Sequence, residues 1–193
     1  MKVVDNKFLI KNRVAPKGRL RDMISQNHMI IKHKEQRVGV FIDTSNLYHS
    51  AKNLYKRKVN FGNVLKDAVA GRKLVRAIAY VIASEGGEEK NFFDALTKLG
   101  IETKSKDLQI FPGGAKKGDW DVGLAIDAIK MSPHLDAVIL ITGDGDHVPL
   151  VEYLKTACQV EVVSFDKSTS GKLIEVADDF LDLSTNPRKY LIY

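Results

Sequence analysis

Blocks of apolar residues alternate with mixed polar and apolar blocks along the chain, once the first 36 residues have passed. Five short apolar runs, rich in Val and Ile, predict strands that are buried on both faces. These runs cover residues 38–43, 74–83, 101–111, 137–144 and 160–165. The third run has the weakest pattern. The sequence therefore predicts a central sheet of five strands.

Between the apolar runs, hydrophobic residues recur at helical spacing. The pattern predicts helices over residues 46–55, 61–70, 88–99, 122–131, 149–157 and 172–181. In the third of these, Phe92, Phe93, Leu96 and Leu99 share one face, and Gly100 follows as a C-terminal stop. Regular alternation of strand and helix favours right-handed crossovers. We therefore expect an α/β fold with a doubly wound parallel sheet, a Rossmann-like three-layer sandwich.

The beginning of the chain has a different character. Met1 to Arg37 contain ten Lys and Arg residues against three Asp and Glu, a net charge of +7, whereas the whole chain carries +6. We expect a basic N-terminal arm over residues 1–36, which could include a short helix at 19–31. Such an arm suits a polyanion such as RNA, and the alternative is a solvated leader. A domain over residues 37–184 and an apolar tail over 185–193 would follow.

Composition excludes several classes of protein. The single cysteine, Cys158, excludes an internal disulfide and a cysteine-rich zinc site. No apolar run approaches the roughly 18 residues of a membrane span, and the N-terminus does not resemble a secretory signal. We therefore expect a cytoplasmic protein with no membrane partner. Its apolar tail could pack on its own domain or on a second copy, which would make a homodimer.

Acidic residues follow two of the predicted strands. In open α/β sheets, ligands bind outside the carboxyl ends of the strands. The first run ends at Asp43, and the fourth runs into Asp144 and Asp146, which with Gly143 and Gly145 form a tight turn. Asp43 alone could simply cap the next helix. Two carboxylates two residues apart repel each other unless a cation lies between them.

A third acidic segment begins a predicted helix. Asp121 falls at its start and Asp119 just before it, where either alone could be an ordinary cap. Asp127 lies six residues further on, points elsewhere, and is expected behind the site or at the surface. Oxygen ligands around an open site suit Mg²⁺ or Mn²⁺. Such a cation would activate water for attack on a phosphodiester.

Other polar side chains are candidates for substrate contacts. Asn46 and Thr142 could orient water or phosphate as part of the catalytic site. Lys116 and Lys117 could bind backbone phosphates, or could be solvated loop residues. Trp120 could stack on a base or anchor its helix to the sheet.

Three segments together carry a family resemblance. FIDTSNL, KKGDWDVGLAIDAI and ITGDGDHVPL resemble the NYN-domain family of LabA-like proteins, within the PIN-like nuclease superfamily, over residues 37–183. The resemblance implies a PIN-like fold and cleavage of RNA with a divalent metal. It also implies Asp43, Asp121, Asp144 and Asp146 as the acidic positions, with Asn46 as their companion.

Two positions depart from the family pattern. Thr142 stands where Ser is usual, which retains the hydroxyl group. His147 stands where Phe is common, so its imidazole either packs behind the site or lies close to the substrate.

The function that follows is a metal-dependent ribonuclease with a four-aspartate site. The alternative is a non-catalytic module of the same fold that binds RNA or a partner, with the basic arm as its functional part. A phosphatase with Asp43 as nucleophile is a third hypothesis. It would favour a DxDxT sequence, and this chain has DTSN instead.

Overall fold

The computed structural model describes residue 30 and residues 32–83, 90–110 and 116–193, with the backbone alone at 109, 110, 116 and 117. The expected arm and its helix at 19–31 lie largely outside these residues. All the elements described below lie within the unit Ile31–Tyr193.

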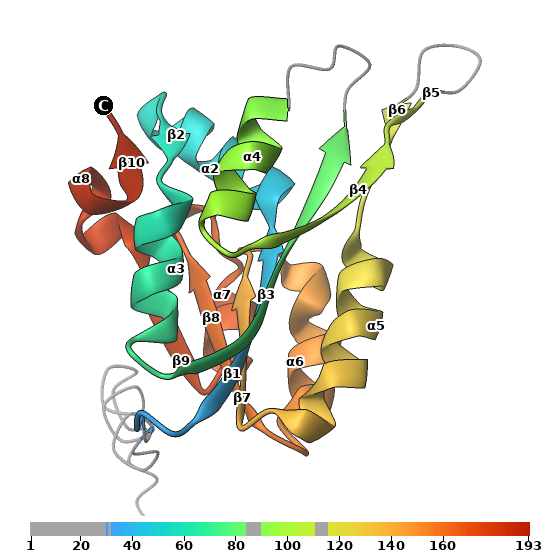
Figure 1. The fold of residues 1–193 in the computed structure, drawn as a ribbon, viewed down its shortest axis with the longest axis vertical. Helices are drawn as coiled ribbons and strands as arrows, with labels where there is room; N and C mark the ends of the chain where they lie inside the picture. The colour runs from blue at the N-terminus through green and yellow to red at the C-terminus, as the bar shows by residue number, and fades with distance from the viewer. Residues whose placement is uncertain (1–29, 31, 84–89, 111–115) are drawn as a thin grey trace, which may run out of the picture. The chain divides into compact units, whose positions relative to one another are not determined.

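A six-stranded parallel sheet forms the centre of this unit, in the order β4-β3-β1-β7-β8-β9 (Figure 1). Its strands are β1 Arg37–Asp43, β3 Lys73–Ala83, β4 Glu102–Asp107, β7 Ala137–Ile141, β8 Gln159–Ser164 and β9 Asp179–Asp182. The chain winds outward from β1 to β4, returns to β7 on the other side of β1, and winds outward again. The predicted doubly wound α/β fold is confirmed, with its switch point between β1 and β7.

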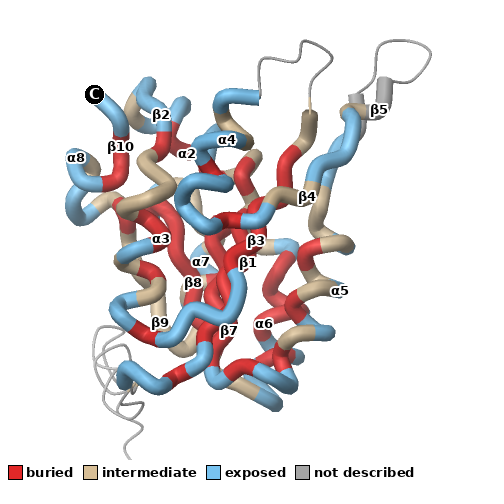
Figure 2. Tube along the Cα trace, in the orientation of Figure 1, coloured by how far each residue is buried: buried red, intermediate tan, exposed pale blue. Residues whose placement is uncertain are grey.

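Helices cover both faces of the sheet. One face carries α2 Thr44–Tyr55, α3 Phe61–Val69 and α4 Lys90–Lys98, and the other carries α5 Asp121–Met131, α6 Val148–Leu154 and α7 Gly171–Val176. Alternation along β1 explains the two cores: Val40 and Ile42 face the first group of helices, whereas Phe41 faces the second. Buried residues accordingly follow the sheet through the middle of the molecule (Figure 2).

The predicted helix over residues 172–181 is wrong in its second half. The helix α7 ends at Val176, and the chain then becomes extended and forms the sixth strand, β9. The side chain of Asp178 accepts a hydrogen bond from the backbone N–H of Val160, at 2.8 Å, which directs the chain alongside β8. Asp178 and Asp179 are also weak helix formers. A strand pairing at the sheet edge therefore outweighed the local helical pattern.

Smaller differences concern the ends of elements. The run at 137–144 forms a strand only to Ile141, and the short 3-10 helix η2 Gly145–His147 follows its turn. The run at 101–111 divides into β4 and β5 Gln109–Ile110, which pairs with β6 Lys116–Lys117. Gly100 has a φ of +73°, as its predicted role at the end of α4 requires.

The C-terminal tail packs on its own domain. After η4 Leu183–Thr185 come α8 Pro187–Tyr190 and β10 Leu191–Ile192, and β10 pairs with β2 Lys58–Val59. Tyr190 and Leu191 are buried in the core of the α2 face. In the described part of the chain, no helix has both the length and the apolar character needed to cross a membrane.

Candidate functional site

A cavity of about 170 Å³ opens at the switch point, where the carboxyl ends of β1 and β7 meet the start of α5. This is the place where ligands bind in doubly wound sheets. Its walls combine acidic, aromatic and polar side chains, from residues Asp43, Ser45, Asn46, His49, Tyr80, Ile82, Gly118, Asp119, Trp120, Asp121 and Asp144.

Asp43, the last residue of β1, serves both the fold and the site. Its Oδ1 accepts a hydrogen bond from the backbone N–H of Asn46 (3.0 Å) and so caps α2, as one reading of the sequence predicted. Its Oδ2 accepts from the Thr142 hydroxyl at 3.3 Å. Burial raises the pKa of Asp43, and the negative charge of Asp144 adds to that rise. Ionised Asp43 is therefore short of compensating charge.

Asn46 and Thr142 fasten the two strand ends together. The side-chain oxygen of Asn46 accepts from the backbone N–H of Gly143 at 2.8 Å. The hydroxyl of Thr142, which is fully buried, accepts from the backbone N–H of Asp144 at 3.2 Å. A Cβ atom on Gly143 would lie 2.8 Å from the backbone oxygen of Ser168, so glycine is required there. These contacts hold the acidic turn in place, and a role for either side chain toward water or phosphate stays a prediction.

Asp144 and Asp146 lie on opposite sides of this turn. Asp144 lines the cavity, and its Oδ1 accepts from the backbone N–H of Asp146 at 3.0 Å, which caps η2. Asp146 is exposed and lines the neighbouring groove. The structure therefore brings Asp43, Asp121 and Asp144 to the cavity, with Asp146 at its outer side.

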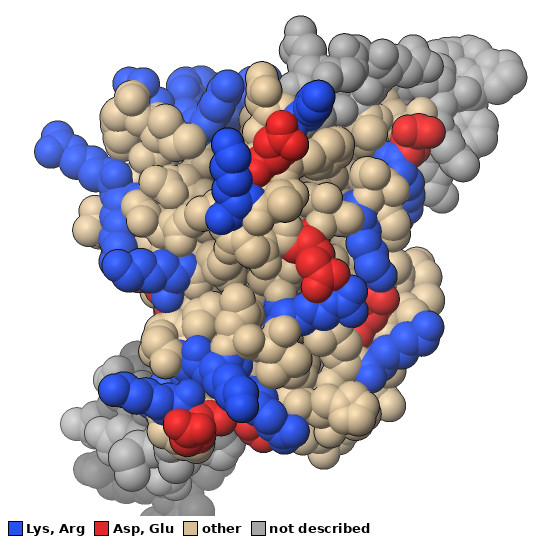
Figure 3. All heavy atoms as spheres, viewed as in Figure 1, with Lys and Arg blue, Asp and Glu red and all other residues tan. Residues whose placement is uncertain are grey.

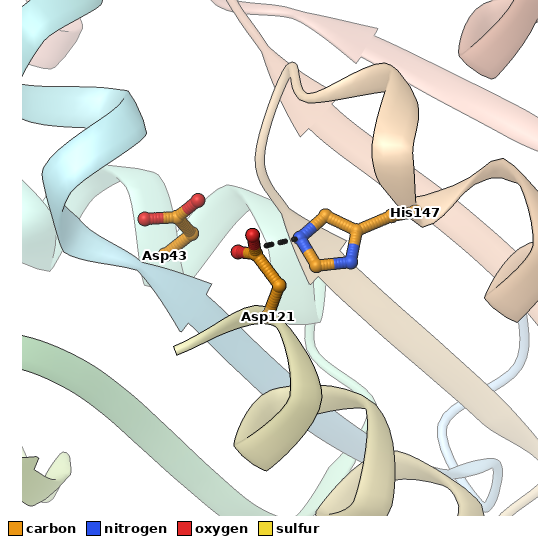
Figure 4. A group of neighbouring side chains, drawn as sticks. All are labelled: Asp43, Asp121 and His147. Atoms are coloured by element: carbon orange, nitrogen blue, oxygen red, sulfur yellow. Dashed lines mark ion pairs between the residues drawn. The ribbon is translucent and has the colours of Figure 1, made fainter. Parts of the chain in front are cut away.

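Asp121 and His147 meet beside Asp43 (Figure 4). Asp121 is the first residue of α5, and burial together with the charges of Asp43, Asp119 and Asp144 raises its pKa. His147 is only 2% exposed, and its Nε2 lies 3.8 Å from Asp121 Oδ1. Ligand atoms of Asp43, Asp121 and His147 lie within 4.8 Å of one another. In the sequence, the sign that pointed to His147 at this site was its departure from the pattern of the resembling family.

The described part of the chain offers the carboxylates of the cavity no Lys or Arg as a partner. Among the residues whose side chains the structure describes, no Lys or Arg forms an ion pair with Asp43, Asp121 or Asp144. Asp127, on the same helix as Asp121, does have such a partner. It accepts from Lys104 Nζ at 2.6 Å, and also from the hydroxyl of Tyr80 at 2.7 Å.

Trp120 anchors the start of α5 to the sheet. Its indole N–H donates to the backbone oxygen of Val81 at 2.9 Å, and Lys106 Nζ lies 4.7 Å from its ring centroid. A Cβ atom on Gly123 would lie 2.5 Å from the ring, so the helix and the indole fit only with glycine there. The ring also lines the cavity. Lys116 and Lys117 form β6, and their side chains lie outside the described atoms.

A second, larger hollow of about 370 Å³ runs between α5 and α6 and adjoins the cavity through Asp121. Most of its lining is apolar, and Asp121, Asp146 and His147 stand at its end. The lining residues are Asp121, Val122, Ala125, Ile129, Asp146, His147, Pro149, Leu150 and Tyr153.

The doubly wound parallel sheet, with helices on both faces and an acidic pocket at its switch point, gives this domain a PIN-like fold. The NYN domain model matches residues 37–184, and the chain belongs to the NYN-domain family, whose domains are generally nucleases. The chain is 26% identical over 163 residues to the low amplitude and bright protein LabA of Synechococcus elongatus, covering 78% of this chain and 86% of that protein. The chain is also similar to a protein of unknown function from Vibrio parahaemolyticus, whose crystal structure matches with a TM-score of 0.75. The two sequences are 30% identical, and the match covers 84% of this chain and 100% of the Vibrio chain.

Proposed function

We propose that this protein is a divalent-metal-dependent ribonuclease that hydrolyses RNA phosphodiester bonds. The observation that carries the proposal is the group of acids from β1, α5 and the turn after β7, gathered at one cavity without a cation from the described chain. Membership of a family of nucleases supports the same reaction class. We assign this activity to a domain over residues 37–184.

The acidic residues fit a Mg²⁺ or Mn²⁺ ion. Asp43, Asp121 and Asp144 would hold it, and Asp146, at the outer side of the turn, completes the proposed four-aspartate set. Burial and mutual repulsion raise the pKa of Asp43 and of Asp121, so both acids would be stabilised by a positive charge. When bound, the cation would acidify an attacking water and neutralise charge on the phosphate.

The surrounding residues would shape the site for a nucleotide chain. Asn46 and Thr142 hold the acidic turn and could also orient water or phosphate. The ring of Trp120 lines the cavity and could stack on a base, and His147 would lie beside the substrate. Lys116 and Lys117 precede α5 and could bind backbone phosphates.

Basic residues elsewhere support a polyanionic substrate. Lys and Arg side chains are spread over the face shown in Figure 3, with Asp and Glu between them. Residues 1–36 add a further excess of positive charge. We propose that this N-terminal arm strengthens RNA binding, and that cleavage itself needs only the domain. Residues 185–193 would be a structural tail.

Cleavage of labelled single-stranded and structured RNA, with Mn²⁺, Mg²⁺ or a chelator, tests the proposal. We expect cleavage only with a divalent ion, and a loss of at least about 100-fold in Asp144→Asn. Asp94→Asn is the matched control, because Asp94 is exposed on α4, away from the site. If Asp144→Asn cut RNA as fast as the parent, the proposed mechanism would be wrong.

Deletion of residues 1–36 separates the ribonuclease from the non-catalytic alternative. A ribonuclease should bind RNA less tightly but keep metal-dependent cleavage of a short substrate. RNA binding that disappears with the arm, in a full-length protein that never cleaves, would favour a binding module.

A further inference from the structure

The imidazole of His147 is buried beside the cavity, and its Nε2 has no hydrogen-bond partner among the described residues. Its side chain is 3% exposed, and within the described part of the chain Nε2 has no donor or acceptor in contact. Nearly all buried polar side-chain atoms in proteins have a partner. Its nearest acid, Asp121, is 3.8 Å away, beyond the range of a hydrogen bond. The nitrogen therefore faces the acids without being bonded to them.

The positions of the three side chains fit a shared ion. Asp43 comes from the end of β1, Asp121 from the start of α5, and His147 from η2, and their side chains converge in Figure 4. Two ligand atoms that are each about 2.1 Å from one cation lie at most about 4.2 Å apart. The three ligand atoms lie within 4.8 Å of one another, so side-chain rotations that bring them closer together would let all three coordinate one ion.

We propose that His147 Nε2 is a ligand of the cation site, together with Asp43 and Asp121, and that this histidine makes the site prefer Mn²⁺ to Mg²⁺. This inference rests on the proposed cation site but not on RNA cleavage. Imidazole nitrogen is a good ligand for first-row transition metals, whereas Mg²⁺ favours oxygen ligands and water. A histidine that replaces one oxygen position therefore favours the transition ion.

The variant His147→Phe isolates the role of the nitrogen. A phenyl ring offers no ligand atom, but it keeps most of the packing of the imidazole.

Pulsed electron paramagnetic resonance of the full-length protein with bound Mn²⁺ tests the ligand directly. A directly bound imidazole gives a ¹⁴N modulation, which we expect in the parent and not in His147→Phe or His147→Gln. His49→Gln is the matched control, because His49 lines the same cavity from α2 but is exposed and outside the three-residue group. That variant should keep the signal.

Calorimetric titration measures the preference itself. We expect Mn²⁺ affinity to fall by at least about 10-fold in His147→Phe, with Mg²⁺ affinity changed by less than about threefold. Circular dichroism checks that the variant is folded. Equal losses for the two ions would contradict the proposed role of the nitrogen.

The parent and the His49 variant decide the ligand even if both His147 variants fail to fold. A parent with bound Mn²⁺ but no ¹⁴N modulation, or a signal that vanishes in His49→Gln, would overturn the assignment. The first result would leave a ribonuclease with an all-oxygen site intact, and the second would leave a ribonuclease with His49 as the nitrogen ligand. Conversely, a clear His147 signal in a protein that never cuts RNA would overturn the ribonuclease and leave this metal site standing.

Discussion

At the amino ends of the strands, the buried carboxylate of Glu161 lies among cations of the chain itself, whereas at the carboxyl ends Asp43 lies among other acids. Glu161 receives hydrogen bonds from both terminal nitrogens of Arg72, and Lys32 Nζ lies 2.8 Å from it. Both Glu161 and Arg72 are almost fully buried. Among the described residues, the donors to Asp43 are a backbone N–H and a hydroxyl.

The contrast shows how one fold can use buried acids in two ways. A buried carboxylate that is fully paired contributes to a unique structure, but it is held by partners that are then unavailable to a ligand. A carboxylate without a counter-charge costs stability, and a cation from solution can recover that cost on binding. The amino end of the sheet is therefore structural, and the carboxyl end is suited to bind an ion.

The largest loss of stability should come from removing the buried ion pair between Arg72 and Glu161. In Arg72→Ala, Glu161 would keep only the partly exposed Lys32 as a cation, and the backbone oxygen of Ala68 would lose a donor. We expect a loss of about 3–5 kcal/mol in the free energy of unfolding, measured by urea denaturation. The control is Arg76→Ala, which removes an exposed pair with Glu102 and should cost less than about 1 kcal/mol. Equal losses would remove the distinction between the two kinds of pair.

At the carboxyl ends of the strands, where Asp43 lacks a counter-charge, removing the charge should not lower the stability of the protein. Asp43→Asn removes a buried charge while asparagine keeps the capping of α2, so the variant should be at least as stable as the parent in chelator. Mn²⁺ at about 100 times its Kd should stabilise the parent by about 2.7 kcal/mol. The variant should gain almost none of this. Thermal denaturation with and without the ion measures both, and an Asp43→Asn that gained as much as the parent would exclude Asp43 as a ligand.

Two acids on α5, Asp121 and Asp127, should affect stability in opposite ways as pH changes. Burial raises the pKa of Asp121, so its ionisation costs the folded state stability as pH rises above about 3.8, the ordinary aspartate value. Burial acts the same way on Asp127, but the hydrogen bonds from Lys104 and Tyr80 outweigh it and lower that pKa. Asp127 therefore contributes stability above pH 3.8 that is lost as pH falls toward its folded pKa.

The matched variants Asp121→Asn and Asp127→Asn should consequently diverge with pH. In chelator at pH 7, we expect Asp121→Asn to raise the melting temperature and Asp127→Asn to lower it. Both differences should shrink as pH falls below 3.8, where the carboxylates become protonated. Melting curves between pH 3 and pH 7 measure this, and shifts of the same sign at pH 7 would contradict the contrast within α5.

The sequence predicted the sheet and the place of the site because both depend on local patterns. Runs of Val and Ile identified β1, β3, β7 and β8, and the rule for doubly wound sheets directed attention to Asp43 and Asp144. Long-range pairing is what the pattern could not show. The sequence 172–181 has helical periodicity, but Asp178 bonds to Val160, and the rest of the segment becomes β9.

The directions of the side chains at the site could not be predicted from the sequence either. Asp144 and Asp146 are two residues apart, yet one lines the cavity and the other the groove, because Asp144 caps η2 and turns the chain between them. The burial of His147 against Asp121 depends on how α5 and η2 approach each other. Trp120 was left open between stacking and anchoring, and only its bond to Val81 showed the anchor.

The smallest effect should come from Thr142→Ser, which tests whether the hydroxyl or the methyl of this residue matters. Serine keeps a donor for Asp43 and an acceptor for the N–H of Asp144, so we expect cleavage within about twofold of the parent. Thr142 is fully buried, so loss of its methyl group should leave a small void that costs about 1 kcal/mol. Thr142→Val reverses the test, because it keeps the shape but leaves Asp43 and Asp144 without their shared partner. If valine cleaved RNA as well as serine does, the hydroxyl would not position the acids, and the acidic turn would be held by Asn46 alone.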